Sequence, residues 1–287
     1  MSGGSDRAPV LVTGATGPHG GAVIAGLLEA GTAVRALTRD PSSERARALS
    51  SHGAEAVAGD MGDAASLVAA MAGVGAVYAV TTPFGAGTEN EEMQGEQLIA
   101  AAEQAGVPWL ILASVASAEQ PTGVPHFESK RRIEERLRAS SLPHTVVAPT
   151  YFYENLGDPR ELIAGGELSL PLPPSQPLQQ VALADLGRLV AALLHRREEF
   201  LGRRIEVAGD DPTPAAMASA LAAAAGTPVA YRRRDLEEVA ARSADLAAMF
   251  GFLAEVGYRV DLAGLRASFP ELGFTPFEAW ARRQLSG

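Results

Sequence analysis

A glycine-rich loop at residues 14–20 restricts the fold of this chain more than any other sequence feature. It follows a short apolar run at 9–13, typical of a buried parallel strand, and leads into a segment with helical spacing. In that context the glycines predict a turn that binds the pyrophosphate of a dinucleotide at a helix N-terminus. The alternative interpretation is an ordinary glycine-rich turn. The residues expected to contact the cofactor here are Gly14, Thr16, Gly17, His19 and Gly20.

The rest of the N-terminal half repeats the alternation of strand and helix. Strands are predicted at 9–13, 33–37, 54–58, 75–80, 107–113 and 144–148, and helices at 20–30, 42–51, 63–72, 89–105 and 127–139. This pattern predicts an α/β chain with a Rossmann-like, doubly wound parallel sheet and helices on both faces.

The regular alternation of strand and helix ends after Pro149. Residues 165–177 are rich in proline and glycine, and helices at 185–195, 212–225, 236–256 and 277–285 are mixed with short strands at 204–207 and 228–231. We expect a flexible tail at 1–8, an NAD(P)-binding Rossmann domain at 9–155, and a smaller C-terminal α+β substrate lobe at 156–287. Late elements of this lobe are free to return to the first sheet.

Composition excludes several classes of function. The net charge of −10 provides no basic excess for a nucleic-acid partner, and the absence of cysteine rules out disulfides and thiolate metal sites. No cluster of histidine and acidic residues has metal-ligand spacing, so no metal is expected. No apolar run has membrane-spanning length, and residues 1–8 do not resemble a signal peptide. We therefore expect a cytoplasmic protein without a membrane partner, and we leave a homodimer open.

The spacing of the loop glycines, Gly-x-x-Gly-x-x-Gly, resembles that of the short-chain dehydrogenase/reductase superfamily. The fuller string LVTGATGPHGGAVIAGLLEAGTAVRALTRDP resembles the atypical NmrA-like family within it. The match is dense over residues 9–60, thinner to 155, and beyond that a similarity of layout. The resemblance implies a nicotinamide cofactor and a reductase of the NmrA-like type.

The end of the second strand bears on the choice of cofactor. It carries Arg39 and no acid before it, and a guanidinium suits the 2′-phosphate of NADP(H). The resemblance assigns the same preference to Arg39, so we expect NADP(H) rather than NAD(H); the alternative is a surface arginine paired with Asp40. The resemblance also implies that Asp60 meets the adenine amine, although a turn-forming role explains it as well. Further cofactor contacts are expected from Met61, Thr81, Thr82 and Thr150.

The catalytic neighbourhood departs from the superfamily pattern. Ser114 follows the fifth strand as the resemblance requires, but the next helix reads His-x-x-x-Lys, from His126 to Lys130, in place of Tyr-x-x-x-Lys. Residues four apart share a helix face, so both side chains can address one ligand. The resemblance implies that Lys130, the single lysine of the chain, holds the nicotinamide ribose; the alternative is one more helix-face charge. His126 is a candidate general acid, a substrate hydrogen-bond donor, or only a helix cap.

The segment after the sixth strand is aromatic and lies where substrate crevices form in such sheets. We expect Tyr151, Phe152, Tyr153 and Asn155, with Phe84 and His126, to bind an aromatic or quinone-like small molecule. Tyr151 or Tyr153 is also a candidate for the missing catalytic phenol. The alternative is that these rings pack between the lobes.

Two functions follow from these observations. The first is an NADPH-dependent oxidoreductase that transfers hydride to a small flat apolar carbonyl, quinone, enone or imine. The second is a non-catalytic NADP(H) sensor that regulates a protein partner, which the missing tyrosine motivates. The aromatic segment and the second lobe favour the enzyme.

Overall fold

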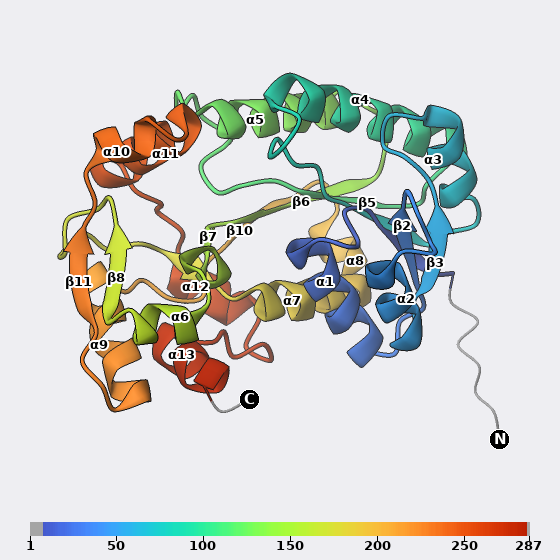
Figure 1. The fold of residues 1–287 in the computed structure, drawn as a ribbon. Helices are drawn as coiled ribbons and strands as arrows, with labels where there is room; N and C mark the ends of the chain where they lie inside the picture. Colours follow the sequence, from blue (N-terminus) through green and yellow to red (C-terminus); the bar gives the residue numbers. More distant parts are fainter. Residues whose placement is uncertain (1–7, 286–287) are drawn as a thin grey trace.

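A computed structural model describes residues 8–285, so all of the expected tail except residue 8 lies outside the described residues. Within them the chain forms a seven-stranded parallel sheet in the order β10-β6-β5-β4-β1-β2-β3 (Figure 1). Its strands are β1 (Val10–Val12), β2 (Val34–Thr38), β3 (Glu55–Ala58), β4 (Ala76–Ala79), β5 (Leu110–Ala113), β6 (His144–Pro149) and β10 (Arg204–Val207). The predicted α/β fold with a parallel sheet is confirmed.

Helices cover both faces of this sheet (Figure 1). One face carries α1 (Pro18–Glu29), α2 (Glu44–Ser51), α7 (Leu183–His195) and α8 (Arg197–Phe200), and the other carries α3 (Ala64–Met71), α4 (Thr88–Ala105) and α5 (Pro125–Arg138). The alternation of side chains along β1 shows why both faces are apolar. Val10 and Val12 belong to the core under α1 and α7, whereas Leu11 belongs to the core under α3 and α4.

Elements beyond residue 155 complete the large sheet. Strand β10 pairs with β6, and α7 packs along α1. The two helices approach closely at a pair of glycines. A Cβ on Gly26 would overlap the backbone of Gly187, and a Cβ on Gly187 would overlap the carbonyl oxygen of Ala22. Late segments therefore do return to the first sheet, so this sheet does not end at the boundary at 155.

The remaining elements form a smaller C-terminal part with its own apolar core. They are β7 (Tyr151–Phe152), η1 (Tyr153–Leu156), α6 (Pro159–Ala164), β8 (Glu167–Leu170), β9 (Gln180–Val181), α9 (Pro214–Ala225), β11 (Ala230–Arg233), α10 (Leu236–Ala240), α11 (Ala244–Glu255), α12 (Leu262–Ser268) and α13 (Phe277–Leu285). Strand β8 pairs in parallel with β11, and β7 with β9. This core includes Phe127 of α5, which joins the two parts of the molecule.

Two local predictions were wrong. The helix expected over 236–256 is broken into α10 and α11, because the Ser243 side chain accepts a hydrogen bond from Leu246 N–H and starts a new helix. Part of the irregular stretch at 165–177 is strand β8, in which Leu168 and Leu170 alternate inward. Its short length and flanking glycines and prolines hid that alternation.

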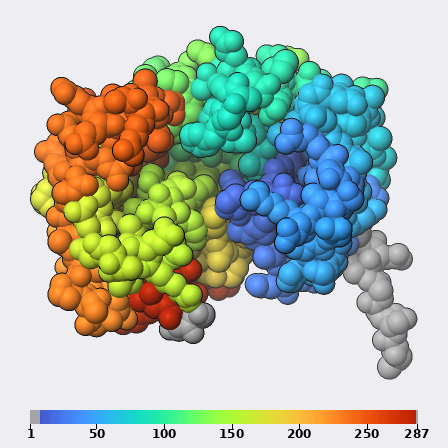
Figure 2. Space-filling view, viewed as in Figure 1, coloured from blue at the N-terminus to red at the C-terminus, as the bar shows by residue number. Residues whose placement is uncertain are grey.

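The space-filling view shows a hollow between the blue residues of the first βα units and the yellow-green residues that follow β6 (Figure 2). It lies at the carboxyl ends of the large sheet, where neighbouring connections leave in opposite directions between β1 and β4. Within residues 8–285, no helix combines the length and apolar character needed to cross a bilayer.

Candidate active site

One cavity of about 1500 Å³ brings together almost all of the predicted site residues. It runs from the ends of β2 and β3, past the glycine loop, to the smaller C-terminal part. The predicted residues that line it are Gly14, Thr16, Gly17, His19, Arg39, Asp60, Met61, Thr81, Thr82, Phe84, Ser114, His126, Lys130, Thr150, Tyr151, Phe152 and Asn155. Gly20 and Tyr153 lie outside the lining.

The glycine loop has the geometry that a pyrophosphate requires. Gly14 has φ +59°, and a Cβ on Gly20 would overlap the Gly14 carbonyl oxygen, so Gly20 sets how closely helix and strand approach. Helix α1 starts at the cavity after Gly17, with no capping side chain and no acid in its first turn. Its N-terminal amides and dipole are therefore available to an anion.

His19 lies in this loop but is turned toward the protein. Its Nε2 is 2.8 Å from the Tyr78 hydroxyl, and its ring meets Phe152 edge-on at 5.4 Å between centroids. Burial and, to a smaller extent, the charge of Lys130 lower the pKa of His19 to about 3. A neutral imidazole packs the floor of the site and adds no positive charge for the phosphates.

The adenosine end of the cavity carries two arginines. Arg39 and Arg45 both line it, and neither has an ion pair within residues 8–285. No ion pair joins Asp40 to Arg39; the Asp40 carboxylate accepts hydrogen bonds from the Ser42 hydroxyl (2.6 Å) and amide (2.8 Å), which lower the pKa of Asp40. The sequence analysis missed Arg45, although its position just after the Ser43 cap of α2 could have indicated it.

Asp60 closes a turn and also lines the cavity. Its Oδ1 accepts a hydrogen bond from Gly62 N–H at 2.8 Å, which closes a turn, and the residue also lines the cavity beside Met61. The hydroxyls of three predicted threonines form hydrogen bonds within the protein. Thr81 bonds Glu91, Thr82 accepts from Phe84 N–H, and Thr150 donates to the Val207 carbonyl.

Lys130 is the centre of a buried polar cluster. The residue is 8% exposed, and its Nζ lies 2.9 Å from Glu91 Oε1 and 2.8 Å from both the Thr81 carbonyl and hydroxyl oxygens. Glu91 is fully buried and also accepts a hydrogen bond from Ser129 Oγ at 2.5 Å. Lys130 therefore both compensates a buried carboxylate and faces the cavity.

His126 is paired with an acid that sequence reasoning missed. Its Nδ1 lies 2.6 Å from Asp245 Oδ2, at an angle that departs from a straight hydrogen bond, and its backbone N–H donates to Asp245 Oδ1 at 3.0 Å. Burial of Asp245 opposes its ionisation, but hydrogen bonding and the charge of His126 outweigh burial and lower the pKa of Asp245. Nδ1 thus lies against this carboxylate, and Nε2 is the other ring nitrogen, which we expect to meet a ligand. Phe84, which is 66% exposed, packs against the His126 ring, and the two ring centroids are 5.9 Å apart.

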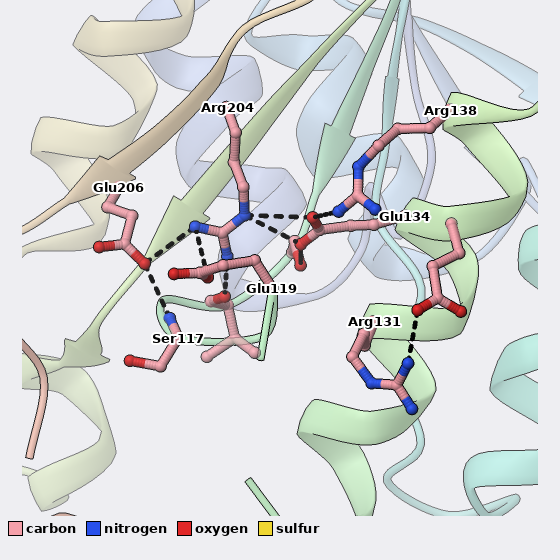
Figure 3. Close-up of polar contacts among 10 residues, drawn as sticks. Ser117, Glu119, Arg131, Glu134, Arg138, Arg204 and Glu206 are labelled. Carbon is pink, nitrogen blue, oxygen red and sulfur yellow. Dashed lines mark hydrogen bonds and ion pairs between the residues drawn. The ribbon is translucent and has the colours of Figure 1, made fainter. Parts of the chain in front are cut away.

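Ser114 does not match the catalytic role predicted for it. Its hydroxyl donates to Glu134, a fully buried acid that also pairs with Arg138 and Arg204. Figure 3 shows Arg204 lying between Glu134, Glu119 and Glu206. Glu206 also accepts the Ser117 amide hydrogen, so β10 holds the loop after β5. The Ser114 hydroxyl thus donates to this network, although the residue also lines the cavity.

The aromatic segment divides between cavity and core. Tyr151 and Phe152 line the cavity, whereas the predicted contact from Tyr153 was wrong. Tyr153 is 0% exposed, donates to the Thr275 carbonyl and packs on Trp280, because η1 turns it inward. A tyrosine from a distant segment, Tyr258, lines the cavity instead. Burial raises the pKa of Tyr151 and of Tyr258, so both phenols stay protonated.

Comparison with known proteins places this geometry in context. The sequence profile described as the NmrA-like family matches residues 6–281. An NAD(P)H azoreductase of Xenophilus azovorans is 31% identical over 235 residues, covering 80% of this chain and 78% of that protein. The (4-alkanoyl-5-oxo-2,5-dihydrofuran-3-yl)methyl phosphate reductase of Streptomyces griseus is 37% identical over 147 residues, and the match spans about half of each protein, 51% of this chain and 49% of the relative.

Solved structures share the fold. The triphenylmethane reductase of Citrobacter sp. in complex with NADP(H) is 22% identical with a TM-score of 0.81, covering 96% of this chain and 99% of that one. NmrA, a negative transcriptional regulator, in complex with NADP is 19% identical with a TM-score of 0.78, covering 97% and 95%. At these identities the likeness shows the fold alone.

Proposed function

The chain belongs to the NmrA-like family, and from that premise we propose that it reduces a small, flat, largely apolar acceptor with hydride from NADPH. The observation that carries the proposal is that His126, which Asp245 contacts from behind the cavity wall, lines the same cavity as the glycine loop and Lys130. A site for binding NADP(H) alone would not need an oriented imidazole beside an aromatic-lined extension. The acceptor classes are a quinone, an azo compound or other imine-like bond, an enone and a simple carbonyl.

The chain's own residues suit NADPH rather than NADH. The glycine loop and the start of α1 would hold the pyrophosphate, and Lys130 and the Thr81 segment would hold the nicotinamide ribose. Arg39 and Arg45 would bind the 2′-phosphate, because planar guanidinium groups match its oxygens and neither is neutralised by a neighbouring acid. When bound, NADPH supplies a hydride, which is two electrons and one hydrogen nucleus.

The protein supplies the proton that completes the reduction. His126 would donate it from Nε2 to the acceptor heteroatom that gains the electron pair, and water would restore the ring. Asp245 fixes the orientation of the ring through its contact with Nδ1. Phe84 and Tyr151 would cover the flat acceptor.

Turnover with a panel of acceptors tests the function. We expect the purified protein to oxidise NADPH with at least one member of a panel containing a quinone, an azo dye, an enone and an aldehyde. His126→Gln should slow that reaction by about 10²-fold or more, the usual contribution of a general acid, while its affinity for NADPH stays the same. Binding of NADPH without oxidation across the whole panel would overturn the proposal.

A non-catalytic sensor of NADP(H) is the second candidate. The absence of a tyrosine four residues before Lys130 favours it, and so does the full set of partners that Lys130 already has. A sensor should capture a protein partner in only one redox form of the cofactor. If the protein captures a partner equally with NADPH and with NADP⁺ and also reduces a member of the acceptor panel, the sensor is excluded and the reductase proposal stands.

A further inference from the structure

The far end of the cavity contains a cation that no acid neutralises. Arg234 follows β11 and lines the cavity, yet its guanidinium has no hydrogen bond or ion pair within residues 8–285. Its backbone N–H donates to the Leu170 carbonyl at 2.9 Å, which extends the pairing of β11 with β8 and fixes the residue beside the cavity wall. A half-buried guanidinium without a partner is a costly arrangement unless a ligand provides one.

Glu167, Asp235 and Glu154 have partners other than Arg234. Glu167 pairs with Arg232 at 2.8 Å, and Asp235 accepts the Glu237 amide hydrogen as the cap of α10. Glu154, which also lines the cavity, accepts hydrogen bonds from the Leu183 amide and the Trp280 indole. The guanidinium of Arg234 therefore lines the cavity without an ion pair in the described chain.

A second polar group at this end is also without a partner. The hydroxyl oxygen of Ser169 is buried and makes no hydrogen bond in the described chain, and Ser169 lines the same cavity. In the register of the two strands Ser169 is opposite Arg232, and alternation places Arg234 on that same face. The serine and the arginine thus lie on one side of the β8–β11 pair, and both line the cavity.

The surroundings of this polar pair are apolar. Leu170, Pro171, Leu246, Met249 and Phe250 line the same end of the cavity. The charge of Arg234 also reaches into this space, since it acts against the burial that raises the pKa of Tyr151. An acceptor that fills the site therefore meets an apolar surface for its ring and a cation with a hydroxyl donor beyond it.

We propose that the acceptor carries an oxyanion group (a carboxylate, sulfonate or phosphate) at the end away from its reacting atoms, and that Arg234 and Ser169 bind this group. The inference rests on the proposed function for the identity of the ligand as an acceptor. The anion subsite itself is a property of the cavity. Arg234 would form paired hydrogen bonds to two oxygens, and the Ser169 hydroxyl would donate to one of them.

Binding of an unreactive anion tests the subsite without any turnover. The probes are 2-naphthalenesulfonate and the neutral 2-naphthalenemethanol, titrated calorimetrically into the protein saturated with NADP⁺. We expect the sulfonate to bind at least tenfold more tightly, and Arg234→Gln to remove that difference. Ser169→Ala should reduce it by a smaller factor, and Arg234→Lys should keep part of it because the charge remains.

Arg233→Gln is the matched control, since Arg233 is the preceding residue, lies outside the cavity lining and is exposed. It should leave the tenfold difference intact. Equal binding of both probes to the wild type, or loss of the difference in Arg233→Gln as well, would overturn the subsite.

Turnover then separates the two proposals. With a naphthoquinone and its sulfonated derivative, the ratio of kcat/KM should favour the sulfonate in the wild type and fall about tenfold or more in Arg234→Gln. If the sulfonate probe binds through Arg234 but no acceptor in the panel is reduced, the subsite stands and the reductase fails. If both quinones are reduced with equal kcat/KM in the wild type and in Arg234→Gln, the reductase stands and the oxyanion assignment fails.

Discussion

Asp245 Oδ2 lies 2.6 Å from His126 Nδ1, although the two residues are 119 positions apart in the chain. The contact joins the first turn of α11 to the first turn of α5, so it ties the smaller C-terminal part to the dinucleotide-binding sheet. The same carboxylate accepts the His126 amide hydrogen at 3.0 Å. One acid therefore positions both the backbone and the ring of the proposed proton donor.

Replacing Asp245 tests that arrangement through the split between kcat and KM. Asp245→Asn alters the contact that orients the ring of the proposed proton donor, so we expect kcat to fall. KM for the acceptor should change less than kcat. The measurement is kcat and KM for the wild type and the variant, with Glu255→Gln at the exposed end of α11 as the control.

Asp245 should also affect stability with a defined sign. Its pKa is lowered in the folded protein, so its stabilising contribution is present above its ordinary value and is lost as pH falls through the lowered value. The wild type should therefore be more stable than Asp245→Asn at neutral pH, and the difference should shrink in acid. A kcat unchanged by the substitution, with a changed stability, would show that Asp245 has a structural role only.

Lys130→Met should destabilise the protein strongly, because it leaves Glu91 buried without a counter-charge. Breaking a buried pair by removing one partner typically costs about 3–5 kcal/mol. The double variant Lys130→Met/Glu91→Gln should recover most of this loss, since a neutral amide can still accept from Ser129. Urea denaturation checks the stabilities. NADPH affinity separates the roles: if Lys130 also holds the cofactor, the double variant stays weak in binding despite its recovered stability.

Two neighbouring glycines provide a matched test of the loop. Gly20→Ala places a Cβ against the Gly14 carbonyl oxygen, whereas Gly21→Ala meets only Ala15 O at 3.7 Å, an ordinary contact. We expect Gly20→Ala to lose about 1–3 kcal/mol of stability and to weaken NADPH binding. Gly21→Ala should keep both, with a gain of up to about 1 kcal/mol from helix propensity. Fluorescence titration with NADPH and thermal unfolding give the two readouts, and equal behaviour of the variants would contradict this account of the loop.

Arg39→Ala should weaken NADPH binding by about tenfold or more and leave NADH binding within about twofold, because only NADPH carries the 2′-phosphate. Arg45→Ala should act in the same direction. The control is Arg47→Ala, because Arg47 lies on the same helix as Arg45 but outside the cavity lining. Dissociation constants for both cofactors check the prediction. An equal loss of affinity for NADPH and for NADH would show that Arg39 does not bind the 2′-phosphate.

The parts of the site that the sequence predicted are those encoded by local pattern. The glycine loop, the strand ends and the His126–Lys130 spacing each depend on residues within one βα unit, and the sheet topology carries them to one edge. The same reasoning found the segment at 151–155, but it could not separate Tyr151 from Tyr153. That difference arises because η1 interrupts the extended chain and turns Tyr153 into the core.

The missed residues act through contacts between distant segments. Asp245, Arg234 and Tyr258 come from parts of the chain with no motif of their own. The fold brings Arg234 and Tyr258 to the cavity and Asp245 to His126. The hydroxyl of Ser114 was assigned by family position, whereas its direction depends on Glu134 and on Arg204 of a strand 90 positions later. The spacing of residues along the sequence does not reveal partners that come from distant segments, such as Glu134 and Arg204.

Transfer of deuterium from NADPH deuterated at nicotinamide C4 to an enone tests the central claim most directly. We predict that the wild-type protein forms a reduced product with one deuterium on the carbon that accepts the hydride, and that His126→Gln forms the same product at least about 10²-fold more slowly. If the protein binds this NADPH and no acceptor of the panel becomes deuterated or reduced, the cavity holds a cofactor without using it, and the proposed reductase is wrong.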